Sequence, residues 1–225
     1  MTGIFDSGAG GLTALSELRR LCPMEDIVFL ADRKNAPYGI RSSENIKRIS
    51  EENIRRLLSH GADRVLIACC TASTVFCDLP EDIKERCIEI ITPAAKAAAE
   101  ACRERIGVIS TEATYKSMAF PRAISAYRSD ISVTAHHSAE LVELVEGGCR
   151  DGNASFEDIS FIRSCLGEIL CAAPEVLILG CTHFTHIKNI IEEITGIPTV
   201  SPSLIGAELA ARQITRCESG ETTFI

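Results

Sequence analysis

Two cysteines follow nearly identical apolar segments, and they are the residues of the chain best suited to chemistry. Val65–Thr71 reads VLIACCT and Val176–Thr182 reads VLILGCT. Each is a short run of apolar residues that ends in a thiol and a hydroxyl, which is typical of a buried strand in a parallel sheet. Open α/β sheets bind ligands at the carboxyl ends of their strands. The pattern therefore predicts two thiols at two binding edges, and two opposed thiols suggest proton-transfer chemistry.

The residues beside these thiols strengthen the case for function. A single buried cysteine is usually inert packing, but Cys69 and Cys181 each stand near a threonine whose hydroxyl can donate a hydrogen bond to a substrate carboxylate. His183 lies two residues after Cys181, and a histidine near a thiol can lower its pKa or carry its proton. No metal site is expected, because the Cys-x-His-x-x-His spacing that ends at His186 is not a standard zinc spacing.

Two turns also have residues that suit ligand binding. Asp6–Gly11 is a glycine-rich turn between the first expected strand and helix, where exposed N–H groups suit an anionic ligand. It matches neither the dinucleotide-binding motif nor the P-loop. Pro37–Gly39 can present the phenol of Tyr38 and a backbone N–H to a ligand. Taken alone, each segment is explained at least as well as an ordinary structural turn.

The repetition extends beyond the two thiol segments. A helical pattern of apolar residues precedes each of them, over residues 46–58 and 159–170. Gly3–Ser7 also resembles Gly107–Thr111, and the repeated segments lie 104 to 111 residues apart. A nearly constant spacing favours an internal duplication.

The alternation of strands and helices in each half predicts an α/β fold with mostly parallel sheets flanked by helices. We expect two pseudo-symmetric lobes, the first formed by residues 1–91 with about 201–225 and the second by residues 92–200. No Pro/Gly/Ser-rich linker separates them, which favours an intimate interface with the active site in the cleft between the lobes.

Composition excludes several classes of protein. The net charge of −8 and the absence of a basic run argue against nucleic acid as a partner. No apolar stretch approaches the ~18 residues of a membrane span, and the first strand begins at Gly3, which leaves no room for a secretory signal. Eleven cysteines without CxxC spacing, the last of them Cys217, are expected to be reduced thiols of a cytoplasmic protein.

Six groups of short motifs occur in order along nearly the whole chain. They are Gly3–Gly8 with Gly10–Leu12, Pro37–Gly39, Ala68–Cys69 with Thr71–Ser73, Pro93–Ala97, Thr111–Thr114 with Lys116–Ser117, and Gly180–His183. In this order they resemble the glutamate racemases, within the aspartate/glutamate racemase superfamily. Each motif is short, but the set is specific.

The resemblance implies cofactor-independent racemisation of L-glutamate to D-glutamate, which supplies peptidoglycan synthesis. It makes Cys69 and Cys181 the two bases: one thiolate removes the α-proton, and the other thiol delivers a proton to the opposite face. It implies that Asp6 and His183 assist these thiols and that Glu146 is a further acidic residue near the site. The substrate-binding set implied by the family comprises Asp6, Ser7, Tyr38, Gly39, Cys70, Thr71, Thr182 and His183. Glutamate is then the expected partner, no metal or cofactor is expected, and a homodimer is compatible with the family.

The chain departs from the family pattern at three places. The family has Cys-Asn-Thr where this chain has Cys70 in the middle, and a thiol cannot replace the donors and carbonyl of an amide. Phe184-Thr185 stands where the family has Tyr-Pro, and Arg33–Asn35 replaces small and polar residues. An ungapped comparison of the thiol segments also pairs Cys181 with Cys70, although the family motif places the base at Cys69.

These departures leave alternatives open. The chain is also compatible with a racemase for another amino acid such as aspartate, or with a weakened relative that keeps the site and binds an anionic metabolite. A metal-dependent hydrolase is a more distant alternative, because the spacing of possible ligands is poor. The paired thiols favour an enzyme over a binding protein.

Overall fold

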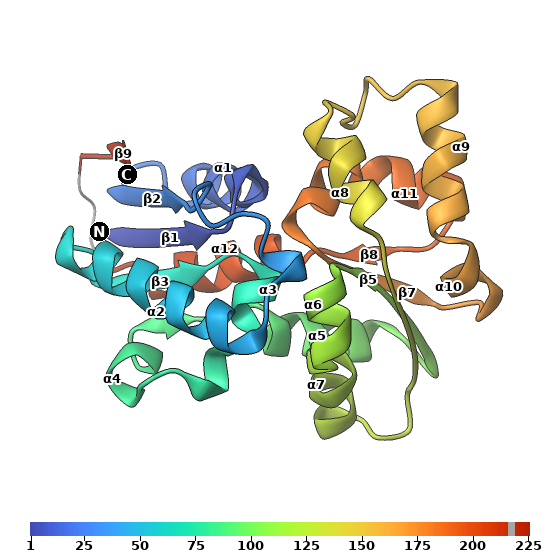
Figure 1. Ribbon diagram of the computed structural model, residues 1–225, viewed down its shortest axis with the longest axis horizontal. Helices are drawn as coiled ribbons and strands as arrows, with labels where there is room; N and C mark the ends of the chain where they lie inside the picture. The colour runs from blue at the N-terminus through green and yellow to red at the C-terminus, as the bar shows by residue number, and fades with distance from the viewer. Residues whose placement is uncertain (216–218) are drawn as a thin grey trace. The chain divides into compact units, whose positions relative to one another are not determined.

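The computed structural model describes residues 1–215 and 219–225, and Figure 1 shows its ribbon. The chain divides into two compact units, Met1–Ile90 with Ser203–Ile225, and Ile91–Pro202. Each unit has a sheet whose strand pairs are all parallel, with helices beside it (Figure 1). The predicted α/β class with parallel sheets flanked by helices is therefore confirmed.

The sheet of the first unit has five described strands in the order β4-β3-β1-β2-β9. They are β1 (Thr2–Asp6), β2 (Ile27–Ala31), β3 (Arg64–Ile67), β4 (Cys87–Ile88) and β9 (Thr222–Phe224). All residues of β1 are buried, since it lies between two neighbours in the middle of the sheet. The chain leaves β1 towards β2 on one side and later returns to β3 on the other. The carboxyl ends of β1 and β3 therefore form a topological switch point, where parallel sheets bind ligands.

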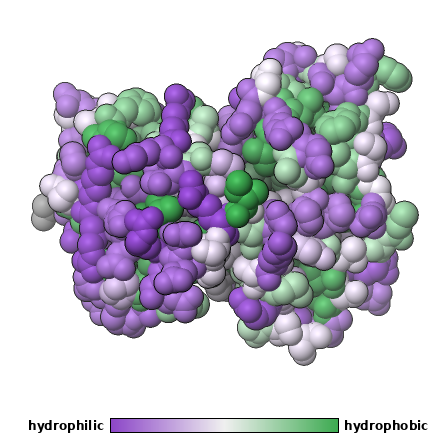
Figure 2. Space-filling model, viewed as in Figure 1, coloured by the Kyte–Doolittle hydropathy of each residue, from purple (hydrophilic) through white to green (hydrophobic). Residues whose placement is uncertain are grey.

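The helices of the first unit position the ends of these strands. They are η1 (Ala9–Gly11), α1 (Leu12–Leu21), η2 (Tyr38–Ile40), α2 (Ser43–Ser59), α3 (Cys70–Ser73), η3 (Phe76–Asp78), α4 (Glu81–Lys84) and α12 (Pro202–Gln213). Helix α2 begins after Ser42, whose side chain accepts a hydrogen bond from the backbone N–H of Asn45. Its buried residues lie on one helix face, at steps of three and four residues from Ile46 to Ile49 and Ser50, and then to Ile54 and Leu57. The outer residues of α2 are polar, and the face of the first unit that it crosses is largely hydrophilic (Figure 2).

Helix α12, near the end of the chain, belongs to the first unit. A Cβ atom on Gly206 would lie 2.5 Å from Ile90 Cγ2 and 2.9 Å from Leu66 Cδ1. Only glycine fits at that distance, so α12 packs closely against β3 and the segment that follows β4.

The sheet of the second unit has four described strands in the order β6-β5-β7-β8. They are β5 (Arg105–Ser110), β6 (Ser132–His137), β7 (Val176–Gly180) and β8 (Thr199–Val200). The helices are α5 (Ile91–Ala101), α6 (Glu112–Ser117), α7 (Ala119–Tyr127), α8 (Ala139–Glu146), α9 (Phe156–Cys165), α10 (Gly167–Cys171), η4 (Thr182–Ile187) and α11 (Lys188–Thr195). The helix expected over residues 159–170 is thus divided into α9 and α10, with Leu166 between them.

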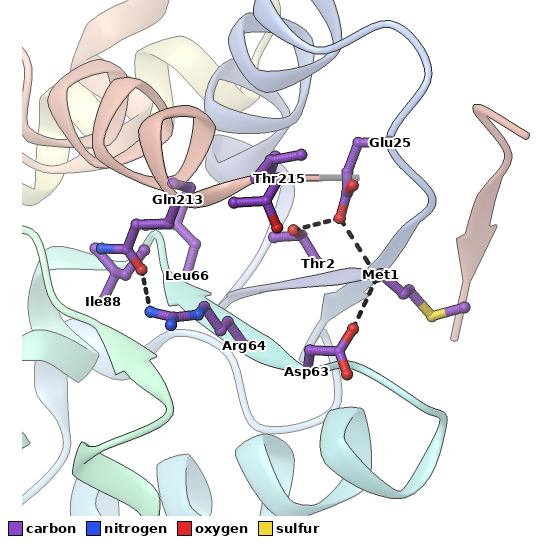
Figure 3. Close-up of a pocket in the computed structure, with 11 residues that line it drawn as sticks. Met1, Thr2, Glu25, Asp63, Arg64, Leu66, Ile88, Gln213 and Thr215 are labelled. Carbon is purple, nitrogen blue, oxygen red and sulfur yellow. Dashed lines mark hydrogen bonds and ion pairs between the residues drawn. The ribbon is translucent and has the colours of Figure 1, made fainter. Parts of the chain in front are cut away.

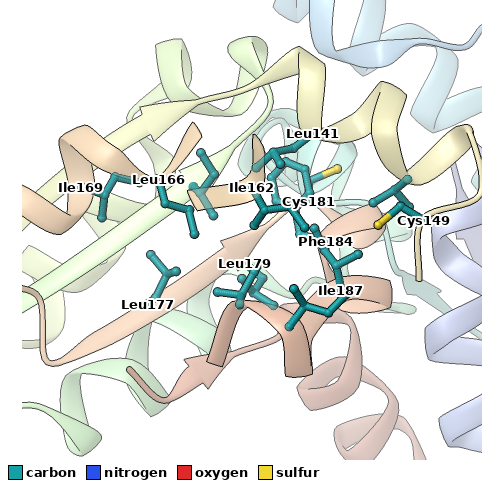
Figure 4. Packing of buried hydrophobic residues seen from close by; sticks show 14 residues of the cluster. Leu141, Cys149, Ile162, Leu166, Ile169, Leu177, Leu179, Cys181, Phe184 and Ile187 are labelled. Atoms are coloured by element: carbon teal, nitrogen blue, oxygen red, sulfur yellow. The ribbon is translucent and has the colours of Figure 1, made fainter. Parts of the chain in front are cut away.

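One apolar cluster packs α8, α9 and α11 against β7 (Figure 4). Leu177 and Leu179 contribute from the strand, and Leu141, Ile162 and Ile191 from the helices. Cys181 belongs to the same cluster. The thiol that follows β7 is therefore held by the packing of the second unit.

The two sheets have the same strand order when β1 to β4 are matched with β5 to β8, because the orders β4-β3-β1-β2 and β8-β7-β5-β6 then coincide. In the first sheet Gly3 pairs with Val65, and in the second Gly107 pairs with Leu177. The repeated segments that begin at Gly3 and Gly107 therefore make Val65 equivalent to Leu177. This agreement of order and register supports an internal duplication.

The same register decides which first-unit thiol corresponds to Cys181. Cys69 lies four residues after the partner of Gly3, and Cys181 lies four residues after the partner of Gly107. The sheets thus match Cys181 with Cys69, and the ungapped comparison that gave Cys70 is out of step by one residue.

A cavity of about 410 Å³ in the first unit lies at the amino ends of β1 and β3, the opposite edge from the switch point (Figure 3). The Met1 amino group pairs with Asp63 at 3.0 Å and with Glu25 at 3.5 Å, and Arg64 donates a hydrogen bond to Gln213. The charged groups that line this cavity are therefore bonded to other residues of its lining.

The packing around β5 gives a testable expectation for stability. We expect Gly107→Ala to destabilise the protein by about 1–3 kcal/mol, because its Cβ would lie 2.6 Å from Ile169 Cγ2 and 3.2 Å from Pro174 Cγ. Gly167→Ala is the matched control, since its Cβ would meet nothing within 4 Å. Urea unfolding measures both. Equal unfolding midpoints would contradict this account of the packing.

Candidate active site

Cys69 lies two residues beyond the end of β3, at the switch point of the first sheet. The N–H of Ala68 still donates to the carbonyl of Phe5 at 2.8 Å, so the chain follows β1 up to the thiol. Cys69 then caps helix α3, and its Sγ accepts from the N–H of Ala72 at 3.5 Å. The side chain is buried, and Sγ also lies 3.3 Å from Ser7 Oγ. Strand, cap and neighbouring hydroxyl together fix the position of the sulfur.

Asp6 ends β1 and is fully buried near this thiol. Its Oδ2 accepts a hydrogen bond from the N–H of Gly8 at 2.9 Å. A Cβ atom on Gly11 would lie 2.4 Å from Asp6 Cβ, so only glycine lets the turn close over this residue. At least one N–H of the glycine-rich turn is therefore used to hold Asp6.

The pKa of Cys69 is raised to about 11. Burial is the largest cause and the negative charge of Asp6 is the second, while hydrogen bonds from Ser7 and Ala72 partly offset them. A cysteine that removes a proton must be assisted or have a lowered pKa. The raised pKa of Cys69 instead keeps its proton in place near neutral pH, which suits this thiol to donate a proton.

Cys70 and Thr71 form the first turn of α3 and are both buried. Cys70 is thus a buried residue that directly follows Cys69, at the position where the family has an amide.

Tyr38 is buried and Gly39 is half-buried in η2. The phenol donates its proton to Asp32 Oδ2 at 2.6 Å and accepts from Asn53 Nδ2 at 3.1 Å. The sequence suggested that the phenol of Tyr38 faces a ligand, but its proton is donated to Asp32. What this turn can still offer is its backbone and the second lone pair of the phenolic oxygen.

Cys181 lies directly beyond β7 and caps η4. It is buried, as are Thr182 and His183 in the first turn that follows. Sγ lies 3.6 Å from His183 Nδ1, within the distance of a hydrogen bond to sulfur. The neighbour of this thiol is thus an imidazole, where Cys69 has Ser7 and the buried carboxylate of Asp6.

Glu146 lies at the end of α8, with its carboxylate Oε1 3.4 Å from His183 Nε2. Nε2 is buried and makes no hydrogen bond within the described residues. A proton taken from Cys181 by Nδ1 would make His183 a cation facing this carboxylate. Sulfur, imidazole and carboxylate therefore form a path that can hold a proton close to Cys181.

His186 is a half-buried residue of η4, and burial lowers its pKa to about 4, so it is neutral near pH 7. Within residues 1–215 and 219–225, no three histidine, cysteine or acidic side chains are grouped so as to bind a metal ion. None of the described helices is long and apolar enough to cross a membrane. The described cysteines are free thiols, and Cys217 lies outside the described residues.

Two residues that the sequence argument missed support this site, Asp32 and Asn53. Asp32 directly follows β2, and an acidic residue at a strand end is a signal that sequence reasoning can use. Asn53 lies in the middle of α2, 21 residues from Asp32, and no local pattern marks it.

Comparison with known proteins adds to this geometry. Residues 13–210 match the Asp/Glu/Hydantoin racemase family, a range that includes both thiols. The chain belongs to this family. It is 35% identical over 216 residues to the glutamate racemase of Pseudomonas paraeruginosa, which covers 95% of this chain and 80% of that protein. The fold, the paired thiols and the family together make the chain an amino-acid racemase.

Solved structures of glutamate racemases have the same fold. The Francisella tularensis enzyme in complex with D-glutamate superposes with a TM-score of 0.86 at 27% identity and covers 99% of this chain and 86% of its own. The Thermus thermophilus enzyme in complex with β-chloro-D-alanine superposes with a TM-score of 0.84 at 31% identity, with the same coverage.

The buried charge beside Cys69 generates the second expectation. Asp6→Asn should lower the pKa of Cys69, because it removes the negative charge that opposes ionisation. With a pKa of about 11 only about 1% of the thiol is ionised at pH 9, and each unit by which the pKa falls raises the thiolate about tenfold. Pulsed alkylation with iodoacetamide at pH 9, read by mass spectrometry, measures the rate at Cys69.

The exposed Cys171 is the internal control, since its alkylation should be the same in both proteins. Alkylation of Cys69 no faster in Asp6→Asn than in the wild type would show that Asp6 does not govern this proton.

Proposed function

We propose that the protein is a glutamate racemase that interconverts L- and D-glutamate without a cofactor. The observation that carries the proposal is the equivalence of Cys69 and Cys181, two buried thiols at matching strand ends with different proton partners. The glutamate racemase names of the relatives, at 34–38% identity, support glutamate as the substrate.

In the proposed reaction the two thiols act on one substrate molecule from opposite faces. A thiolate takes the α-proton and becomes a thiol, and the electron pair stays on the α-carbon. The other thiol then gives its proton to the opposite face of that carbon and becomes a thiolate. Atoms and charge balance, and the roles are exchanged for the reverse reaction.

The two environments suggest which thiol starts in which state. Cys69 holds its proton through a raised pKa and is suited to donate it, whereas His183 can accept the proton of Cys181. After one turnover the thiolate is at Cys69, beside Asp6, where burial and charge make it a strong base. This thiolate becomes a thiol again when it removes the α-proton of the opposite enantiomer.

Without a cofactor, the substrate's α-proton must be made acidic by position and by hydrogen bonds to its carboxylate. We assign this role to the hydroxyls of Thr71 and Thr182, each close in the sequence to a thiol. The ammonium group of the bound amino acid would offset the negative charge of Asp6 and help to ionise Cys69. Asp6 and Ser7 therefore tune the base as well as line its site.

Three wider assignments follow the family resemblance. The product D-glutamate would serve peptidoglycan synthesis, the protein would act in the cytoplasm, and it would associate as a homodimer. Aspartate is a second candidate substrate, because Cys70 stands where the family has an amide that contacts the substrate. A relative that binds an anionic metabolite without turnover is the non-catalytic alternative.

One experiment tests the reaction and separates these alternatives. The protein is incubated in heavy water with L- or D-glutamate and L- or D-aspartate, and NMR follows the α-proton while polarimetry follows optical purity. With glutamate we expect the α-proton signal to disappear and optical purity to be lost. Exchange with aspartate alone would move the substrate to aspartate, and no exchange from folded protein would overturn the racemase assignment.

Variants of the thiols identify the bases in the same assay. Cys69→Ala and Cys181→Ala should each abolish racemisation, because each removes the proton carrier of one face. Cys70→Ala should retain measurable racemisation, and Cys171→Ser is the control at an exposed thiol. Loss of activity in Cys70→Ala with activity kept in Cys69→Ala would show that Cys70, and not Cys69, is the base.

Substitutions of His183 and Glu146, the two residues of the proton path beside Cys181, should lower kcat by different amounts. His183→Asn should lower kcat by about 10²- to 10⁴-fold, the range of a positioned acid–base group. Glu146→Gln should cost less than about fivefold, because its side chain is 63% exposed and exposed ion pairs contribute about 1 kcal/mol or less. Glu143→Gln, an exposed change on the same helix, is the control. Equal losses in His183→Asn and Glu146→Gln would contradict this ranking.

A further inference from the structure

A half-buried asparagine on α2 reaches the turn that carries Tyr38 and Gly39. Asn53 Nδ2 lies 2.7 Å from Asp32 Oδ2 and 3.1 Å from the Tyr38 oxygen, and Tyr38 in turn lies 2.6 Å from the same Oδ2. Three polar groups from separate elements therefore meet: the loop after β2, η2 and α2.

The donors and acceptors in this cluster leave one arrangement. Asn53 Nδ2 has two hydrogens and no acceptor, so the Tyr38 oxygen accepts one of them and Asp32 accepts the other. The phenolic proton must then be donated to Asp32. Asn53 thus fixes the direction of the Tyr38 hydroxyl as well as its position.

Asp32 is the anionic centre of the cluster. Burial raises its pKa, but hydrogen bonds from Tyr38, Asn35 and Asn53 outweigh this and lower the pKa below its usual value. Asn35 is bonded from its side chain to Asp32 at 2.9 Å, and its carbonyl accepts from Arg41 Nε at 2.6 Å. The loop on both sides of the turn is thereby tied to one carboxylate.

This cluster is next to the catalytic machinery of the first unit. The Tyr38 ring packs against Phe5 of β1 with ring centroids 6.2 Å apart. η2 also contacts α3, the helix that Cys69 caps. A negative charge on Cys69 would raise the pKa of Tyr38 further. A hydroxyl aimed at Asp32 does not donate its proton to that sulfur.

We infer that Asn53 is a positioning residue that holds the Tyr38–Gly39 turn in its substrate-binding conformation through Asp32 and the Tyr38 hydroxyl. The inference rests on the proposed racemase function. Asn53 contacts no reacting atom in this account. It acts on substrate binding, by keeping the backbone of the turn in place and the phenolic proton away from Cys69.

The test uses two substitutions at Asn53 and the same two at Asn45, an exposed asparagine on the same helix. Asn53→Leu removes both donated hydrogen bonds. It should raise the KM for glutamate about 10- to 100-fold, the effect of losing a hydrogen bond to a charged group, and change kcat less than threefold. Asn45→Leu should leave KM and kcat unchanged.

Asn53→Asp adds a readout that a merely structural residue would not move. The introduced carboxyl would lie within hydrogen-bond distance of Asp32, and two such carboxylates cannot both ionise easily, so one pKa rises. The shared proton restores one donor when the pH falls. The ratio of kcat/KM in the variant to that in the wild type should therefore rise at least threefold from pH 8 to pH 5.5, whereas the ratio for Asn53→Leu and for Asn45→Asp should stay flat.

Other ionisable groups near this pair titrate in all of the proteins, so the ratio removes their contribution. The charged or titratable groups that face the cluster or share its elements are Asp6, Arg33, Lys34, Tyr38, Arg41, Glu44, Lys47, Arg48, Glu51, Glu52, Arg55, Arg56 and Cys69. On α2, Glu52 is paired with Arg48 and Glu51 with Arg55.

A double-mutant cycle with Tyr38→Phe gives an independent measurement if Asn53→Asp does not fold. Asn53→Leu should add less than threefold to the KM of Tyr38→Phe, because the two residues act through one cluster. Circular dichroism establishes that each variant is folded. An active wild type with unchanged KM in Asn53→Leu, or fully multiplicative effects in the cycle, would overturn the inference. A folded wild type without racemisation would instead overturn the function on which it rests.

Discussion

The burial of a carboxylate beside a thiol is the constraint on which the first half of the site depends. Asp6 is fully enclosed at the end of β1, and its charge together with burial keeps the proton on Cys69. Such an arrangement is costly unless the carboxylate is bonded, and the Gly8 N–H supplies a bond because Gly11 lets the turn close. The glycine-rich turn, the strand end and the protonation state of the thiol are therefore one connected feature.

The duplication explains how one fold supplies two different acid–base groups. Strand order and register place Cys69 and Cys181 at equivalent positions, so the same arrangement of the backbone positions both thiols. The side chains around each sulfur then differ: a carboxylate and a hydroxyl near Cys69, and an imidazole near Cys181. A racemase must both remove and deliver a proton, and in the reaction proposed above the unequal surroundings let one thiol begin as donor and the other as acceptor.

The sequence predicts the fold and the thiols well, because both depend on local patterns. Apolar runs that end in Cys-Thr mark buried strands, and their repetition marks the duplication. The ungapped comparison of the two thiol segments differs from the structural register by one residue. Only the pairing of neighbouring strands shows that Ala68 follows β3 before the cap of α3 begins. The raised pKa of Cys69 was not predictable either, because it depends on burial and on a carboxylate 63 residues away in the sequence. Asn53 reaches Tyr38 only through the packing of α2, for which the chain carries no local signal.

The last described strand has a consequence of a different kind. β9 is three residues long and pairs with β2, whose sequence IVFLA would otherwise form the open edge of the sheet. Phe224 packs edge-on against Phe29, and the N–H of Ile225 bonds to the carbonyl of Phe29. An apolar strand with unpaired backbone groups is a template for aggregation, and a short covering strand is a common protection against it. Because β9 covers this edge, removal of residues 222–224 would expose the backbone groups of β2 and favour aggregation, although these residues lie outside the set assigned to the chemistry.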